Sequence, residues 1–317
     1  MSLATTLRIG TRGSQLALWQ SRTVAGLLEA NGVRVDLVVI KTSGDRLQDA
    51  PLAAAGGKRL FVKEIEDALL RGDVHLAVHS AKDMPALLPD GLDIAATLPR
   101  EDPRDALILA PASPSGDLSA ALNHLGATPS IGTSSVRRAA QLAVLVPGGR
   151  FLPIRGNVDT RLRKLDGGDF DALVLASAGL KRLGLTGRIS AAFPIDRCVP
   201  APGQGIIAVE TRADDGATRR VLEPLHNIEA GIALAAERAL VNALGGGCQL
   251  PLGGIVIHNG TVLDMHAVVT SLDGRHVIKR HRQGVATSPE DLGKRVAQEL
   301  TEAGAREILD EVRGGKS

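Results

Sequence analysis

Short apolar segments alternate with amphipathic ones through the first 180 residues, and this alternation leaves few folds open to the chain. The segment 74–79 has the composition of a buried strand, and 60–71 before it repeats apolar residues at helical spacing. A second buried strand is predicted over 172–176. Strands that alternate with helices form a mostly parallel sheet with helices on both faces. The sequence therefore predicts a doubly wound α/β fold.

The predicted elements form two successive α/β blocks, with no sequence repeat between them. Ser14 is a suitable N-cap for the first helix, and Thr133 or Ser134 for a helix over 135–146. The segment 200–205, rich in proline and glycine, is predicted to be a crossing or hinge. Strands are predicted over 7–10, 33–42, 74–79 and 92–98, then over 106–109, 130–132, 150–155 and 172–176; further helices are predicted over 60–71 and 158–165.

The last hundred residues have a different pattern. A helix is predicted over 228–243, and three strands follow, over 252–258, 261–269 and 275–282. Their connections, Asn259-Gly260 and Asp273-Gly274, are strong hairpin signals. A further helix has Ser288 as its cap and Pro289 at its first position. These signals predict a small third domain with a three-stranded antiparallel sheet backed by helices.

Composition excludes several classes of function. The net charge is +2 and the aromatic residues are four Phe, one Trp and no Tyr, so neither a basic surface nor base-stacking platforms for nucleic acid are expected. No apolar run approaches the roughly 20 residues of a membrane span, and we expect a cytoplasmic protein with reduced thiols. The eight histidines show no His-x-x-x-His spacing and there is no Cys-x-x-Cys pair, so no metal site is predicted.

Lys82 and Asp83 stand where the predicted strand 74–79 opens into a loop, because Pro85 disfavours a helix in the residues just before it. Ligands of open α/β sheets bind outside the carboxyl ends of strands. A carboxylate at that place can respond to positive charge that develops on a bound molecule. The alternative is an ordinary salt bridge within the loop.

Arginines recur at the boundaries of the predicted elements. Guanidinium groups near helix N-termini, which already carry partial positive charge, suit a ligand with several carboxylates or phosphates. Each single arginine could instead form a surface salt bridge. The six arginines at such positions are Arg12, Arg137, Arg138, Arg155, Arg161 and Arg182.

The two cysteines differ in their surroundings. Cys248 follows Gly245-Gly246-Gly247, and glycines let bulky groups approach closely, so this thiol could be exposed for covalent attachment. The alternative is a buried packing cysteine. Cys198 lacks such a glycine approach and is predicted to pack in a core.

Seven motifs, in this order, together resemble the porphobilinogen deaminase (hydroxymethylbilane synthase) family of tetrapyrrole biosynthesis. The likeness extends over nearly the whole chain. The motifs occupy residues 8–14 (RIGTRGS), 56–61 (GGKRLF), 79–85 (HSAKDMP), 132–138 (GTSSVRR), 155–161 (RGNVDTR), 202–205 (PGQG) and 246–251 (GGCQLP).

The resemblance implies a transferase with three domains. Domains 1 and 2 would resemble the lobes of a periplasmic binding protein, with the active site between them, and the chain would cross between them twice. Domain 1 would comprise 1–103 and 202–224, domain 2 would comprise 104–201, and domain 3 would comprise 225–317. Cys248 would carry a dipyrromethane cofactor through a thioether, and the family favours a monomer.

The activity implied is the stepwise head-to-tail condensation of four porphobilinogen units onto that primer, each with loss of ammonia. Water would then release the linear tetrapyrrole hydroxymethylbilane. Asp83 would be the catalytic group, holding pyrrole N–H groups and stabilising the azafulvene cation that ammonia loss leaves. The residues expected to bind the carboxylates of substrate and cofactor are Arg12, Ser14, Lys58, Lys82, Thr133, Ser135, Arg137, Arg138, Arg155, Arg161, Arg182 and Gln204.

This sequence departs from the family pattern at three places. Arg59 stands where glycine is usual, Ala53 to Ala55 replace a common lysine, and Leu250 replaces a β-branched residue. None of these changes removes a group that the chemistry requires. Two other functions compete: a solute-binding module that captures an anion without transforming it, and an arginine-rich nucleic-acid binder, which the near-neutral charge opposes.

Overall fold

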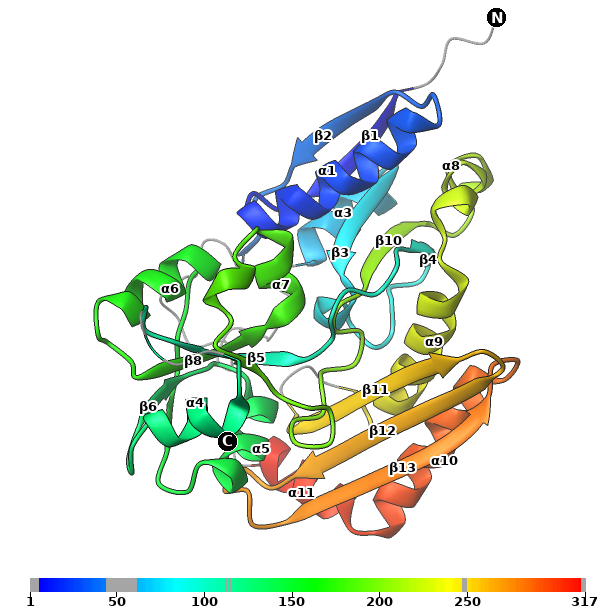
Figure 1. Cartoon of the computed structure of the whole chain (residues 1–317). Helices are drawn as coiled ribbons and strands as arrows, with labels where there is room; N and C mark the ends of the chain where they lie inside the picture. The colour runs from blue at the N-terminus through cyan, green and yellow to red at the C-terminus, as the bar shows by residue number, and fades with distance from the viewer. Residues whose placement is uncertain (1–5, 44–61, 112, 114–115, 247–249, 315–317) are drawn as a thin grey trace, which may run out of the picture.

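The computed structural model describes residues 6–43, 62–111, 113, 116–246 and 250–314, which form three units with one sheet each (Figure 1). The first unit, called the first lobe below, has a five-stranded sheet. Its strands lie in the order β2 (Val35–Val39), β1 (Leu7–Thr11), β3 (Leu76–Ser80), β10 (Ile207–Arg212) and β4 (Leu92–Thr97). Its helices are α1 (Gln15–Ala30), α3 (Lys63–Leu70) and α8 (Gly216–Leu222), and short 3₁₀ turns are η2 (Ala81–Asp83) and η4 (Glu223–Leu225).

The second lobe repeats this arrangement with a different part of the chain. Its strands lie in the order β7 (Arg150–Leu152), β6 (Ser130–Gly132), β8 (Ala172–Ala176), β5 (Asp105–Leu109) and β9 (Ala191–Ala192). Its helices are α4 (Leu118–His124), α5 (Val136–Leu145), α6 (Val158–Asp166) and α7 (Ser177–Arg182), with a 3₁₀ turn, η3 (Thr186–Arg188).

The C-terminal domain has an antiparallel sheet of β11 (Leu252–Asn259), β12 (Val262–Thr270) and β13 (Val277–Val285). Gly260 and Gly274, in the two hairpin turns, have φ of 64° and 74°, which explains why glycine follows Asn and Asp there. One face of the sheet packs on three helices, α9 (Ile228–Ala243), α10 (Pro289–Glu302) and α11 (Ala305–Gly314).

The central strands of the two five-stranded sheets are buried, as their apolar sequences predict. All five residues of β5 are buried, and four of the five are in β3 and in β8. Ile9, Leu28 and Val209 are fully buried in the core of the first lobe, and Phe193 is almost fully buried in that of the second. Burial on both faces explains why these strands lack a polar alternation.

The predicted architecture is confirmed: two α/β domains, each with a five-stranded sheet, and a small C-terminal α+β domain with a three-stranded antiparallel sheet. The expectation of mostly parallel sheets is confirmed, because in each sheet four of the five strands run in the same direction and one strand runs against them. β10 runs antiparallel to β3 and β4, and β5 runs antiparallel to β8 and β9. β10 was not predicted at all, because its place between two strands of the first lobe is set by pairing with residues far away in sequence.

Two segments connect the lobes, 98–104 from β4 to β5 and 193–206 from β9 to β10, and we call them the crossing segments. The amide of Glu101 donates to the carbonyl of Gly205 at 3.0 Å, so the two segments touch. The predicted crossing over 200–205 is thus confirmed. The domain boundaries stay a prediction.

Candidate functional site

The carboxyl ends of β1 and β3 lie at the same edge of the first sheet, because these strands pair in parallel. Arg12 follows β1, and Lys82 and Asp83 follow β3 within the turn η2. Gly203 of the second crossing segment packs against this turn: a Cβ there would lie 2.9 Å from the backbone of Ala81 and Lys82. Glycine therefore allows the crossing segment to support the turn that carries Asp83.

The second sheet presents its own carboxyl ends in the same way, because β6, β7 and β8 are parallel neighbours. Thr133 and Ser135 follow β6, and Arg155 follows β7. Ser135, rather than Thr133 or Ser134, is the N-cap of α5, and its hydroxyl accepts from the amide of Arg138 at 3.4 Å. Thr133 is buried, and its hydroxyl accepts from the amide of Ser135 at 3.2 Å.

Arg161 joins the two edges electrostatically. Burial and the cations Arg138 and Arg155 together lower the pKa of Arg161 to about 10, against the opposing effect of the Asp83 carboxylate. Its Nε donates to the carbonyl of Gly156 at 2.8 Å. Arg161 of the second lobe is therefore coupled electrostatically to Asp83 of the first lobe and to two further predicted arginines of its own lobe.

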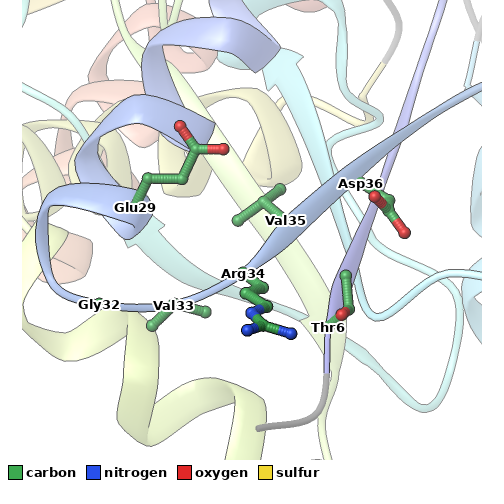
Figure 2. A pocket seen from close by; sticks show the side chains of 7 residues that line it. All are labelled: Thr6, Glu29, Gly32, Val33, Arg34, Val35 and Asp36. Atoms are coloured by element: carbon green, nitrogen blue, oxygen red, sulfur yellow. The ribbon is translucent and has the colours of Figure 1, made fainter.

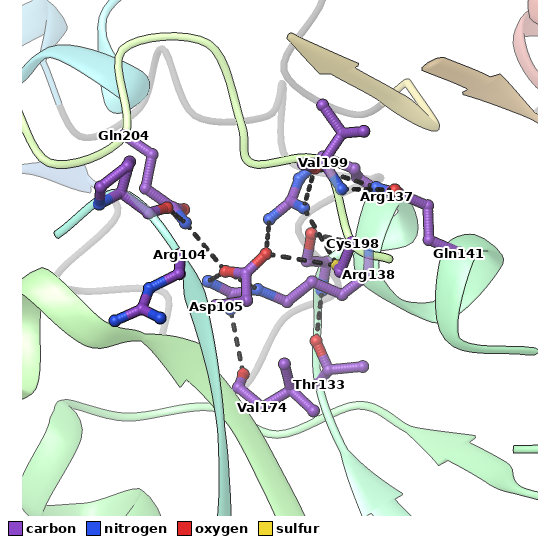
Figure 3. Close-up of polar contacts among 12 residues, drawn as sticks. Arg104, Asp105, Thr133, Arg137, Arg138, Gln141, Val174, Cys198, Val199 and Gln204 are labelled. Atoms are coloured by element: carbon purple, nitrogen blue, oxygen red, sulfur yellow. Dashed lines mark hydrogen bonds and ion pairs between the residues drawn. The ribbon is translucent and has the colours of Figure 1, made fainter. Parts of the chain in front are cut away.

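Arg137 and Arg138 lie deeper than the sequence suggested, with exposed fractions of 4% and 7%. Both form ion pairs with the fully buried Asp105, each with an N–O distance of 2.7 Å (Figure 3). Arg137 also donates to the carbonyl of Val199 at 2.7 Å, and Arg138 to that of Val174 at 3.0 Å. Burial alone would raise the pKa of Asp105, but the two guanidinium groups outweigh it and hold this pKa well below its ordinary value.

Gln204 connects this cluster to the first lobe. Its Nε2 donates to Asp105 at 2.9 Å and to the carbonyl of Pro103 at 2.6 Å, and its Oε1 accepts from Lys82 Nζ at 3.3 Å. Figure 3 shows Asp105 between Gln204 of the second crossing segment and the two arginines of α5. Gln204 thus lies in the interior of the crossing, next to Lys82, as a bridge between the two lobes.

Arg182 and Ser14 lie near the same interface with their own contacts. Arg182 donates to the carbonyl of Gly205 at 2.7 Å and stacks over the Trp19 ring at 5.9 Å from its centroid. Burial lowers the pKa of Arg182 to about 10, against the opposing effect of Glu101. Ser14 is the predicted N-cap of α1, and its hydroxyl accepts from the amide of Ala17 at 3.3 Å.

Cys248 and Lys58 lie outside the described residues, so their roles stay predictions. The flanking residue Gly246 is described, and a Cβ on it would lie 3.7 Å from Ala86 Cβ. Arg238 of α9 donates to the carbonyls of Pro85 and Ala86, at 2.9 and 2.7 Å. The C-terminal domain therefore contacts the loop that follows Asp83.

Cys198 is fully buried, as predicted for a packing cysteine. Its Sγ donates to the Asp105 carboxylate at 3.5 Å. Burial, together with that carboxylate, raises the pKa of Cys198 to about 12, so the thiol stays protonated and unreactive.

Sequence reasoning missed two buried carboxylates that organise this region, Asp105 and Glu237. Glu237 of α9 accepts from Arg100 at 2.8 and 2.9 Å, from the amide of Gly203 at 2.6 Å and from that of Val256 at 2.7 Å. It thereby holds both crossing segments against the C-terminal domain. No local signal marks either residue, since their partners are distant in sequence.

The hollow drawn in Figure 2 is not this site. Thr6, Val35 and Asp36 line it together with the end of α1, at the amino ends of β1 and β2. It therefore lies at the edge of the sheet opposite to Asp83. Among the described residues, no helix is both long and apolar enough to cross a membrane.

Two α/β lobes joined by two crossing segments, with an aspartate of one lobe acting on an arginine of the other, define a two-lobed α/β protein. The profile described as "Porphobilinogen deaminase, dipyromethane cofactor binding domain" matches residues 7–220, and "Porphobilinogen deaminase, C-terminal domain" matches 232–302. The chain belongs to the porphobilinogen deaminase family.

Curated relatives support this assignment over nearly the full length. Porphobilinogen deaminase of Syntrophobacter fumaroxidans is 46% identical, covering 96% of this chain and 97% of its own. That of Acidithiobacillus ferrooxidans is 47% identical, covering 97% and 98%. Among solved structures, the VFT2 domain of Bordetella pertussis BvgS has a TM-score of 0.42 at 15% identity, covering 74% of this chain and 92% of that domain.

Proposed function

We propose that this chain is a hydroxymethylbilane synthase, which condenses four porphobilinogen units head to tail with loss of ammonia and releases the linear tetrapyrrole by hydrolysis. Membership of the porphobilinogen deaminase family supports the reaction. The single observation that carries the proposal is the electrostatic coupling of Arg161 in the second lobe to the Asp83 carboxylate of the first, with Arg138 and Arg155 acting on the same guanidinium group. The carboxylate of Asp83 therefore acts on a region of the protein that is rich in positive charge.

The positive charge of the described residues around Arg161 complements the negative charge of the dipyrromethane carboxylates. Arg161 is partly exposed, and its lowered pKa reflects both the loss of water around this cation and the repulsion from neighbouring cations. Anionic carboxylates placed there would relieve that cost through charge-assisted hydrogen bonds. When bound, through a thioether to Cys248, the dipyrromethane supplies the primer for chain growth.

Asp83 acts on the substrate in this proposal. Ammonia loss from porphobilinogen leaves a cationic azafulvene, and a fixed carboxylate stabilises positive charge that develops in the transition state. The same carboxylate accepts hydrogen bonds from pyrrole N–H groups and moves protons as each carbon–carbon bond forms. The Arg161 cation acts on Asp83, and a nearby opposite charge favours the ionised form that this role needs.

The remaining proposed residues bind carboxylates of the substrate and the growing chain. Arg161 is coupled to both Asp83 and Arg155, whereas Arg137 and Arg138 share Asp105 and contribute mainly positive potential. We propose further that the protein is a cytoplasmic monomer. The complete set of proposed carboxylate-binding residues is Arg12, Ser14, Lys58, Lys82, Thr133, Ser135, Arg137, Arg138, Arg155, Arg161, Arg182 and Gln204.

Intact mass under denaturing conditions tests the covalent primer. We expect an adduct with the mass of a dipyrromethane on the purified protein. The adduct should disappear in Cys248→Ser and persist in Cys198→Ser, the matched control for a buried thiol. An active protein of unmodified mass would refute the attachment.

Asp83→Asn tests the catalytic role. We expect the turnover number to fall by at least about 10²–10³-fold, the effect of removing one preorganised electrostatic group, while the adduct stays in place. Asp90→Asn, an exposed aspartate in the same lobe, is the control and should leave turnover unchanged. Near-normal turnover in Asp83→Asn would remove Asp83 from the mechanism.

A further inference from the structure

The outer face of the C-terminal sheet carries a cluster of potential metal ligands that the proposed reaction does not use. Asp264 and His266 are two residues apart on β12, so they point to the same face. His281 of β13 is the cross-strand partner of His266. The alternate residues Leu263, Met265 and Ala267 point the other way, into the core beneath the sheet.

The ligand atoms of these three side chains converge. One carboxylate oxygen of Asp264 and one ring nitrogen from each histidine all lie within 4.8 Å of one another. The two imidazole rings stack with centroids 4.3 Å apart, and His281 Nε2 contacts the Asp264 carboxylate. Among the described residues, no other group of three or more such side chains meets in this way.

We propose that Asp264, His266 and His281 form a binding site for a divalent transition-metal ion such as Zn²⁺. Two imidazoles and one carboxylate are a ligand set that zinc accepts, with water in the remaining position. Zinc–ligand bonds of about 2 Å separate two ligand atoms by at most about 4 Å. Closing the cluster around the ion therefore needs only small side-chain rotations.

The surroundings favour such a site over a chance contact on the surface. β12 and β13 pair over nine residues, and this rigid hairpin holds the three ligands in place. The side chains of Asp264, His266 and His281 are 20%, 27% and 56% exposed, so an ion can enter from solvent. Lys279 on the same face is held by the carbonyl of Asp196, which belongs to the second crossing segment.

The position of the cluster links it to the crossing segment. Val268, next on the same face of β12, packs with Val199 and Ile195 of that segment. A bound ion would therefore link β12 to β13 beside the residues of the sheet that pack on the second crossing segment.

Zinc titration calorimetry of the tag-free, cofactor-bearing protein tests the proposal. We expect one zinc ion per chain. His266→Ala and His281→Ala should each weaken binding by more than about 10–100-fold, the loss that an outer-shell change alone produces. His276→Ala, an exposed histidine of the same domain, is the control and should bind zinc as the unchanged protein does.

Nuclear magnetic resonance signals of the eight histidine rings provide a second test, which needs no variants. On addition of zinc, the ring signals of His266 and His281 should shift before those of the other six. Failure of the unchanged protein to take up zinc at about millimolar concentration would overturn the site. Undiminished binding in His266→Ala and His281→Ala, or shifts confined to other histidines, would overturn it equally.

Discussion

Replacing Asp105 by asparagine removes the negative charge on which two buried arginines depend. The Asp105 carboxylate forms 2.7 Å ion pairs with Arg137 and Arg138 and accepts from Gln204 at 2.9 Å. Asparagine keeps one acceptor oxygen but presents an amide N–H₂ to groups that are all donors. Two guanidinium groups with exposed fractions below a tenth would then lie without a counter-charge.

The magnitude follows from the burial of this cluster. Removing one partner of a buried ion pair costs about 3–5 kcal/mol, because an uncompensated charge is left out of water. We expect Asp105→Asn to lower the free energy of unfolding by about that amount, measured by urea denaturation with circular dichroism. Asp166→Asn, which breaks the more exposed pair with Arg188, should cost at most about 1 kcal/mol.

The pH dependence gives an independent check. The folded pKa of Asp105 lies well below its ordinary value of 3.8, so its stabilisation is present above that value and is lost as the pH falls below it. The stability gap between the unchanged protein and Asp105→Asn should therefore stay constant from about pH 5 to 8 and narrow only below about 3.8. A gap below about 1 kcal/mol at neutral pH would refute the reasoning.

Two further substitutions probe the crossing segments. Gly205→Ala places a Cβ 2.2 Å from the carbonyl of Glu101 at φ +88°, whereas Gly32→Ala has a similar φ of +78° and open space. Thermal unfolding should show Gly205→Ala to be the more destabilising by at least about 1–3 kcal/mol, and equal effects would contradict the contact. Glu237→Gln leaves Arg100 without its buried partner and should cost about 3–5 kcal/mol in urea denaturation; a loss near zero would contradict the anchoring role.

Local pattern was sufficient for elements whose signals lie within a few residues. The strand over 172–176 and the helix over 228–243 have the predicted bounds, and the hairpin glycines have the backbone that their turns need. The predicted strand over 150–155 is shorter, ending at Leu152. β10 escaped prediction because its pairing with β3 joins Ala208 to His79, more than 120 residues apart.

The residues of the candidate site likewise fall into those that local sequence predicts and those that it does not. Asp83 and Lys82 could be placed from sequence, because a strand that ends before a proline identifies a loop at the edge of a sheet. The pairing of Arg137 and Arg138 with Asp105 could not, since nothing near Asp105 distinguishes an internal counter-ion from a surface carboxylate. The histidine cluster was missed for a related reason: spacing rules address one element, and the cross-strand register brings His281 opposite His266.

The buried carboxylates explain how one aspartate can face arginines of another lobe. Asp83 and Arg161 belong to different lobes, so their approach depends on the two crossing segments. Gln204 holds one of these segments to Asp105, and Glu237 holds both of them to the C-terminal domain. Because breaking either set of contacts would leave charges buried without partners, these contacts constrain the crossing segments strongly. The C-terminal domain therefore helps to set the relative placement of the lobes, in addition to contacting the loop beyond Asp83 through Arg238.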